Sequence, residues 1–229
     1  MVVDYGSSPE QRAGTREICQ RHGAEHVAVD GASVWSRSRC MNVGLRLGRT
    51  KYLLASDADI VFSPGYLADA CERMRAEPLA VVCSQMFDLP EDSVDTVSRA
   101  ATSTEPPRAE EWKDRSAPRY EWFHPSVCMT YTSCFQLIRG YDEFYELWGG
   151  EDDDLMRRFE DLGLLPTALD TDSFFLHQWH PKFSGLVTGR NSDPVERNEA
   201  YFSSHHSLLR NHADWGLAAA ISRAERRYA

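Results

Sequence analysis

The chain has 229 residues, 42% of them hydrophobic and 26% charged, which is typical of a folded globular protein and excludes a disordered or collagen-like one. Its 25 basic and 35 acidic residues give a net charge of −10, which argues against a nucleic-acid partner because phosphate backbones bind basic surfaces. There is no apolar stretch long enough for a membrane span and no signal-peptide pattern, and the six cysteines are scattered without a CxxC pair. We therefore expect a reduced, cytoplasmic protein rather than a disulfide framework.

The first half of the chain alternates strand and helix signals. Ser8-Pro9-Glu10-Gln11 forms a capping box with proline at the first helical position. Helices are predicted at residues 9–22, from Ser33 or Ser36 to Leu47, and from Ser63-Pro64 to Pro78, and strands at residues 1–4, 25–29, 52–55 and 79–83. Because strands that alternate with helices pair in parallel, we expect an α/β fold with a mixed, mainly parallel sheet flanked by helices.

The second half changes in character. Residues 87–119 are rich in proline, serine, threonine and charge, which indicates a long surface excursion. The later predictions are a strand or strand pair at residues 127–138, a helix ending at Leu162, short strands at 164–168 and 173–176, a loop over 182–198 and a helical end from about Glu199. We expect one domain over residues 1–229, with a nucleotide-binding part (1–86), a variable excursion (87–126), an acceptor and metal part (127–183), and a lid loop with a C-terminal helix (184–229).

Asp57-Ala58-Asp59 follows an apolar strand and is the first candidate site. Alternate side chains of a strand point the same way, so both carboxylates can face one ligand. Two carboxylates at the carboxyl end of a strand suit a hard divalent cation bound together with phosphate oxygens. The alternative is a solvated turn with two capping aspartates, and spacing alone favours it because the DxD pattern is short and common.

The second candidate is WGGEDDD at residues 148–154. Carboxylates in a first helical turn interact favourably with the helix dipole, so a simple helix cap is one interpretation. Four consecutive acids exceed what a cap needs and repel one another, and two glycines allow a ligand to approach the backbone closely. We therefore favour a functional site here.

Two further patterns carry candidate side chains. His177 and His180 follow a predicted strand and can both reach one cation, and imidazole suits Mn²⁺, but these residues alone leave a structural role equally open. Trp35, Arg37 and Arg39 lie near a helix start, where arginine binds phosphate and an indole offers a stacking face. Taken alone, an ordinary exposed helix explains these three residues better.

Together these patterns resemble the GT-A glycosyltransferases, most closely the β1,4-galactosyltransferase-like branch and its bacterial relatives in the large family 2. WSRSRCMNVGL is similar to the branch's nucleotide-contacting helix, and YLLASDADIVFSPGYL to its metal strand. GYDEFYELWGGEDDDLMRRFEDLGL is similar to its acceptor and catalytic segment, and FFLHQWHP falls where the family places its later metal ligands. The resemblance covers about residues 25–183, and its specific part is WGGEDDD preceded by GYDE.

The resemblance implies a role for each matching residue. Asp59, His180 and His177 match the ligands of Mn²⁺ or Mg²⁺. Asp152 matches the general base, and its acidic neighbours would raise its pKa. The acceptor side is implied to include Glu151, Trp148, Gly149 and Gly150. The donor side is implied to include Asp57, Ala58, Trp35, Arg37 and Lys182, with Asp4 as a weaker match.

The implied activity is a metal-dependent, inverting transfer of a sugar from a nucleotide diphosphate, favoured as a UDP-sugar, to a hydroxyl acceptor. A non-catalytic GT-A module that binds a sugar or nucleotide is the alternative, and a nucleotidyltransferase a more distant one. Residues 182–196 are predicted to be a lid. The family's usual first strand and helix are missing, so the domain is expected to be a genuine short version, to have a start assigned too late, or to have its open sheet edge covered by a partner such as a second copy.

Overall fold

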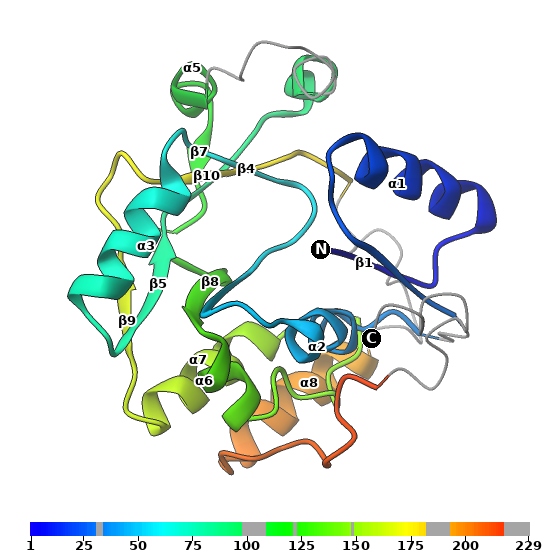
Figure 1. Cartoon of the computed structure of the whole chain (residues 1–229), viewed down its shortest axis with the longest axis vertical. Helices are drawn as coiled ribbons and strands as arrows, with labels where there is room; N and C mark the ends of the chain where they lie inside the picture. The colour runs from blue at the N-terminus through cyan, green and yellow to red at the C-terminus, as the bar shows by residue number, and fades with distance from the viewer. Residues whose placement is uncertain (31–33, 98–108, 121–122, 148, 182–192, 218–229) are drawn as a thin grey trace. The chain divides into compact units, whose positions relative to one another are not determined.

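The computed structural model describes residues 1–30, 34–97, 109–120, 123–147, 149–181 and 193–217. The elements, in chain order, are β1 (Val2–Tyr5), α1 (Pro9–Arg21), β2 (His26–Val29), α2 (Arg37–Leu47), β3 (Tyr52–Ala55), β4 (Ile60–Phe62), α3 (Tyr66–Ala76), β5 (Ala80–Ser84), β6 (Met86–Asp88), the 3₁₀ helix η1 (Glu91–Ser93), α5 (Ala109–Lys113), β7 (Ala117–Pro118), β8 (His124–Tyr131), α6 (Thr132–Leu137), α7 (Glu151–Asp161), β9 (Leu165–Ala168), β10 (Phe175–His177) and α8 (Asp193–Ser204) (Figure 1). No helix among these residues is long and apolar enough to cross a lipid bilayer.

The chain divides into two compact units. Unit 1 comprises residues 1–53, 131–162 and 189–229, and unit 2 comprises residues 54–130 and 163–188. Each unit therefore combines segments from distant parts of the sequence.

Unit 1 begins with β1 and β2, which pair in parallel from Val2–His26 to Tyr5–Val29. The predicted capping box is confirmed: the Ser8 hydroxyl accepts from the Gln11 backbone N–H, and the Gln11 side chain accepts from the Ser8 backbone N–H. Ser36 caps α2 by accepting from the Arg39 N–H. The core beneath α2 is a valine cluster with flanking side chains: Val27, Val29 and Val43, packed by Val3, Tyr5 and Leu47.

The later part of unit 1 is built around α7. Its apolar side chains Leu155 and Phe159 are buried, as the helical spacing predicts, and Phe159 packs edge-on against Phe135 of α6. Asp154 and Arg158 are also fully buried, with Arg158 Nε 2.7 Å from Asp154 Oδ2. Helix α7 is therefore held by a buried ion pair as well as by an apolar face.

Unit 2 contains the two larger sheets of the described residues, with strand orders β4-β10-β6-β7 and β3-β8-β5-β9. β10 runs antiparallel to β4 and parallel to β6, while β5 runs antiparallel to β8 and parallel to β9. The predicted mixed α/β architecture is confirmed. Among the strand pairs whose direction is described, three are parallel (β1–β2, β6–β10 and β5–β9) and three are antiparallel (β4–β10, β5–β8 and β6–β7).

Two element boundaries differ from prediction. The apolar run at residues 127–138 continues β8 only to Tyr131 and then forms α6, in which Phe135 is buried, as is Ile138 at its C-cap three residues later. A short apolar run is compatible with either a strand or a buried helix, so its pattern did not settle the choice. Helix α3 starts after Gly65 rather than at Ser63, whose hydroxyl instead accepts from the Phe174 N–H.

The C-terminal prediction is also corrected in part. Helix α8 begins at residue 193, inside the segment predicted as a loop, and it ends at Ser204, so the residues that follow it up to 217 are not helical. The Asn198 side chain donates to the Glu146 carbonyl at 2.9 Å, and the Tyr201 and Phe144 rings stack at 3.7 Å. These contacts tie α8 to the loop that leads into α7.

Candidate functional site

Unit 2 brings Asp59, His177 and His180 together. Asp59 lies in the turn between β3 and β4, after the apolar strand as predicted. His177 ends β10, which pairs antiparallel with β4 so that His177 lies opposite Ile60, and the Gln178 N–H donates to the Asp59 carbonyl at 2.9 Å. The sheet therefore places the two histidines beside a carboxylate from a distant part of the sequence.

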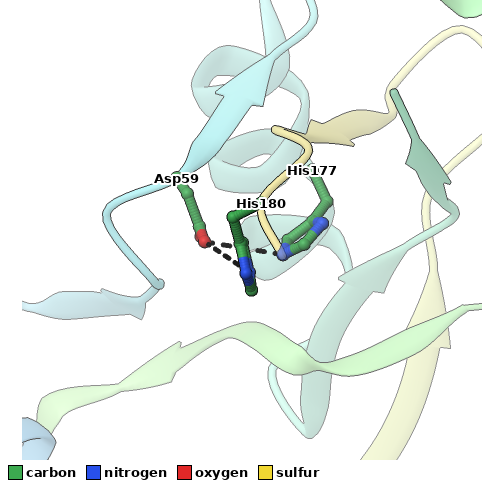
Figure 2. A group of neighbouring side chains, drawn as sticks. All are labelled: Asp59, His177 and His180. Carbon is green, nitrogen blue, oxygen red and sulfur yellow. Dashed lines mark ion pairs between the residues drawn. The ribbon is translucent and has the colours of Figure 1, made fainter. Parts of the chain in front are cut away.

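The three side chains point toward one another (Figure 2). Asp59 Oδ2 is 3.5 Å from Nε2 of His177 and 3.5 Å from Nε2 of His180, and one ligand atom from each residue lies within 4.8 Å of the others. The second carboxylate oxygen, Asp59 Oδ1, is buried and accepts no hydrogen bond from the described part of the chain. One carboxylate and two imidazoles suit Mn²⁺ or a similar divalent cation, so the residues present fit a metal ion.

The charges of this cluster are coupled. Burial disfavours the charged imidazolium, but the hydrogen bonds to Asp59 and Asp88 raise the pKa of His177 to about 9. Burial alone would raise the pKa of Asp59, but the hydrogen bond and the charge of His177 lower it below its usual range. In the absence of a cation, a proton on His177 thus compensates the carboxylates around it.

The other two residues of the DxD pattern are separate from this cluster. Asp57 is half-buried and Ala58 is exposed at the turn, and neither belongs to the metal-ligand group found among the described residues.

Unit 1 contains the acidic start of α7. Gly149 and Gly150 have φ values of 108° and 86°, which strongly favour glycine, and Gly150 is the N-cap residue. A Cβ on Gly150 would lie 3.2 Å from the Tyr145 ring, so this glycine first of all allows the helix to start here. Glu151 is buried, and its Oε2 accepts from the Gly149 N–H at 2.7 Å.

Asp152, the residue after Glu151 in α7, forms an ion pair. Its Oδ1 is 2.6 Å from Nη1 of Arg37, and both side chains are mostly buried. The Arg37 guanidinium also lies over the Tyr141 ring, 5.3 Å from its centroid. The sequence analysis assigned Arg37 to the donor nucleotide and gave Asp152 only acidic neighbours, so this pairing is a finding of the structure.

The remaining donor-side candidates in unit 1 have their own surroundings. Trp35 is 46% exposed and lies edge-on to Tyr5 at 5.9 Å. Asp4 is buried; its Oδ1 accepts from the Ser7 N–H at 3.1 Å, and its Oδ2 is 3.5 Å from Arg12 Nε. An open cavity of about 270 Å³ next to α1 is lined by Ser7, Pro9, Arg12, Ala13, Arg16 and Asp30. The predicted pair Trp35 and Arg37 does not line it.

Trp148 and Lys182 lie outside the described residues, as does the predicted lid before residue 193. Sequence reasoning missed Asp88 and Arg119, which contact His177 from the segment predicted as a variable excursion. The position of Asp88 directly after the apolar pair Met86-Phe87 was an available signal, since polar residues at strand ends line ligand sites in α/β sheets.

Comparisons with known proteins agree with this architecture. Residues 111–180 match the family model described as the N-terminal domain of galactosyltransferase. No curated protein matches the chain.

Many solved structures resemble the chain, and two of them show the agreement. The catalytic domain of Drosophila β1,4-galactosyltransferase 7 in complex with xylobiose matches with a TM-score of 0.51 and 15% identity, over 90% of this chain and 81% of that one. GalNAc-T7 with UDP, GalNAc and Mn²⁺ matches with a TM-score of 0.55 and 11% identity, over 88% of this chain and 44% of that one. The resemblance predicted from the motifs is therefore confirmed: the chain has the fold of the GT-A glycosyltransferases, and residues 111–180 match a galactosyltransferase family model.

Proposed function

We propose that the protein is a metal-dependent glycosyltransferase that moves a sugar from a nucleotide diphosphate donor to a hydroxyl acceptor. The observation that carries this proposal is the cluster of Asp59, His177 and His180, in a chain with a glycosyltransferase fold. The UDP and Mn²⁺ in GalNAc-T7 and the xylobiose in galactosyltransferase 7 favour a UDP-sugar donor, Mn²⁺ and a sugar acceptor.

In this proposal, the metal ligands stabilise the nucleoside diphosphate that leaves the donor. A cation held by Asp59, His177 and His180 supplies Lewis-acid neutralisation of the charge that develops on the diphosphate. Asp57 then hydrogen-bonds the donor sugar or ribose, and the exposed face of Trp35 stacks on the donor. Among these residues, Asp59 is the most sensitive position, because it is the carboxylate in contact with both histidines.

The acidic start of α7 serves the acceptor. Asp152 is assigned as the general base: it takes the proton of the acceptor hydroxyl as the new bond to the anomeric carbon forms, with inversion of configuration. The ion pair with Arg37 fixes the position of this carboxylate. An acceptor hydroxyl must therefore compete with the Arg37 guanidinium for the Asp152 carboxylate oxygens. Asp152 can take the proton only after the bound acceptor has displaced part of this pairing.

The same ion pair favours one alternative, a module that binds a nucleotide or sugar without turnover. A carboxylate that stays paired with arginine is a poor base, and Glu151 is already engaged by the Gly149 N–H. The alternative predicts donor binding without release of nucleoside diphosphate.

A release assay distinguishes these functions. The protein is incubated with Mn²⁺, a panel of UDP- and GDP-sugars and simple glycoside acceptors, and free nucleoside diphosphate is measured. We expect release of UDP that EDTA suppresses and that Asp59→Asn abolishes, while Asp57→Asn retains Mn²⁺ binding. Calorimetric binding without release supports the module, and release of pyrophosphate supports a nucleotidyltransferase.

A further inference from the structure

A carboxylate and a guanidinium lie behind His177, on the side away from Asp59. His177 Nδ1 is 3.1 Å from Asp88 Oδ1 and 2.9 Å from an Arg119 terminal nitrogen. Arg119 also grips Asp88 with two nitrogens: its Nε donates to Oδ2 at 2.9 Å, and its Nη2 donates to Oδ1. The three side chains therefore form one connected group, and Asp59 is 3.5 Å from the other ring nitrogen of His177.

The sheet builds this group. β10 pairs in parallel with β6 so that His177 lies opposite Asp88, and β6 pairs antiparallel with β7, which directly precedes Arg119. Backbone bonds hold the register on both sides: the Leu89 N–H donates to the His177 carbonyl at 3.0 Å, and the Arg119 N–H donates to the Met86 carbonyl at 2.9 Å. Strand pairing thus fixes the backbone positions of Asp88 and Arg119 beside His177.

The chemistry of a neutral imidazole decides what this group does. One ring nitrogen carries a proton and the other a lone pair, and a metal binds only the lone pair. Since Nε2 of His177 faces Asp59, metal binding there requires the proton on Nδ1 and an acceptor for it. Asp88 is such an acceptor, whereas Arg119 only donates and would favour the opposite tautomer.

His180 shows the same requirement met in a simpler way. Its Nδ1 is 3.0 Å from the Pro181 carbonyl, and its Nε2 faces Asp59. A carbonyl oxygen only accepts, so this contact places the proton on Nδ1 and leaves the Nε2 lone pair for a cation. His177 has no such carbonyl among the contacts described, and Asp88 occupies the equivalent place.

We propose that Asp88, oriented by the two-nitrogen grip of Arg119, is a positioning residue of the metal centre, which accepts the Nδ1–H of His177 and so presents its Nε2 lone pair to a divalent cation beside Asp59. The inference rests on the proposed function, because it assigns Asp59, His177 and His180 as metal ligands. Partners of this kind fix the orientation and tautomer of a ligating histidine.

The test is Mn²⁺ affinity without any sugar donor. Calorimetry of Asp88→Ala should show affinity weaker by about 10- to 100-fold, as loss of such a partner typically causes. Asp92→Ala is the matched control, because Asp92 forms an exposed pair with Arg115 at 2.8 Å in the same segment. It should bind Mn²⁺ like the unmodified protein. Asp88→Asn, which retains an acceptor oxygen but loses the charge that holds Arg119, should fall between the two.

Nitrogen-15 NMR of the histidine rings gives a readout that a merely structural role would not move. In the unmodified protein at a pH where His177 is neutral, we expect the Nδ1–H tautomer, and Asp88→Ala should shift His177 toward Nε2–H. Finding Nε2–H in the unmodified protein overturns the inference without any variant.

The inference and the proposed function fail in different ways. If His177→Ala loses Mn²⁺ binding and both Asp88 variants keep it, Asp88 is not a positioning residue and the metal centre stands. If His177→Ala binds Mn²⁺ with undiminished affinity, the metal centre itself is wrong.

Discussion

Asp152 sits 2.6 Å from a guanidinium nitrogen on a different helix of unit 1, and this one contact joins two segments that the sequence analysis treated separately. A charged hydrogen bond of this length both orders the carboxylate and competes with any substrate hydroxyl for it. At the residue scale, the proposed base is therefore positioned before an acceptor arrives, and its availability depends on Arg37.

Replacing Asp152 with asparagine tests its role. Asparagine retains the shape but cannot take a proton, so turnover should fall by about 10²–10⁴-fold, the usual range for loss of a positioned base. Kinetics with a UDP-sugar measure this, and calorimetry should show Mn²⁺ and UDP affinities close to normal. Asp161→Asn, on the exposed end of the same helix, should leave turnover unchanged.

Asp4 gives a prediction for pH. Burial alone would raise the pKa of Asp4, but hydrogen bonds from Ser7 and the nearby charges of Arg12 and His26 lower it below its ordinary value of 3.8. A carboxylate with a lowered pKa stabilises the folded state above its unfolded pKa, and this contribution disappears as the pH falls through the folded pKa. Asp4→Asn should therefore be less stable than the unmodified protein at pH 7, by about 1–2 kcal/mol.

Thermal unfolding of both proteins between pH 7 and pH 3 measures that difference. It should shrink steadily below about pH 4, because there the carboxyl of the unfolded chain takes up a proton while that of the folded protein, with its lowered pKa, is still ionised. A difference that stays constant down to pH 3 would show that the Asp4 charge contributes nothing to folding.

At the scale of elements, the first turn of α7 carries the proposed general base, and the residues that follow it form a buried ion-pair network. Two residues beyond Asp152, Asp154 forms a fully buried pair with Arg158, and Arg158 donates further to the Gly140 carbonyl at 2.7 Å. Arg210 adds a third charge, with a nitrogen 3.1 Å from Asp154. This network fixes the helix start in place, because moving it would separate buried charges.

Removing one partner of that pair should be costly. Asp154→Ala leaves the Arg158 guanidinium buried without its carboxylate, so the free energy of unfolding should fall by about 3–5 kcal/mol in urea titrations. Glu17→Ala is a matched control, because Glu17 and Arg21 form an exposed pair with the same spacing along a helix. Its effect should stay within about 0.5 kcal/mol. Equal effects of the two substitutions would contradict a stabilising role of the buried network.

The elements also show what the sequence can and cannot predict. The Ser8 capping box and the apolar face of α7 depend on neighbouring residues, and both were predicted. The start of α6 was not predicted, because a short apolar run fits a buried strand as readily as a buried helix. Local patterns thus predicted most elements, and errors arose where tertiary packing chose between two conformations.

The candidate site divides in the same way. Asp59, His177 and His180 were predicted from their motifs, and the structure brings them together. Asp88 and Arg119 were missed, because their approach to His177 follows from the strand order β10-β6-β7, which no local pattern contains. The Arg37–Asp152 pair was missed for the same reason, since it joins residues far apart in the sequence.

At the scale of the whole molecule, the net charge of −10 opposes the approach of an anionic nucleotide-sugar. In the proposed function, a local cation would therefore act beyond the chemical step, because it would offset the field of the protein where the diphosphate binds. The same repulsion is screened by salt over a Debye length of about 10 Å at 0.1 M, so association of the donor should be faster at moderate than at very low ionic strength.

The ligands of the proposed metal centre come from the β3–β4 turn and from the end of β10 with the residues just after it, which lie far apart along the chain. A cation bound to both is a reversible cross-link: it closes a long loop that the unfolded chain would otherwise leave open, and it binds the folded form alone. At a hundredfold excess over its dissociation constant, it should add about 2.7 kcal/mol to the free energy of unfolding. Scanning calorimetry should therefore record a transition that rises with each increment of Mn²⁺ and returns to its starting temperature when a chelator is added, while His180→Ala melts at one temperature throughout. The concentration of available Mn²⁺ would then determine the stability of the folded protein as well as its rate of turnover.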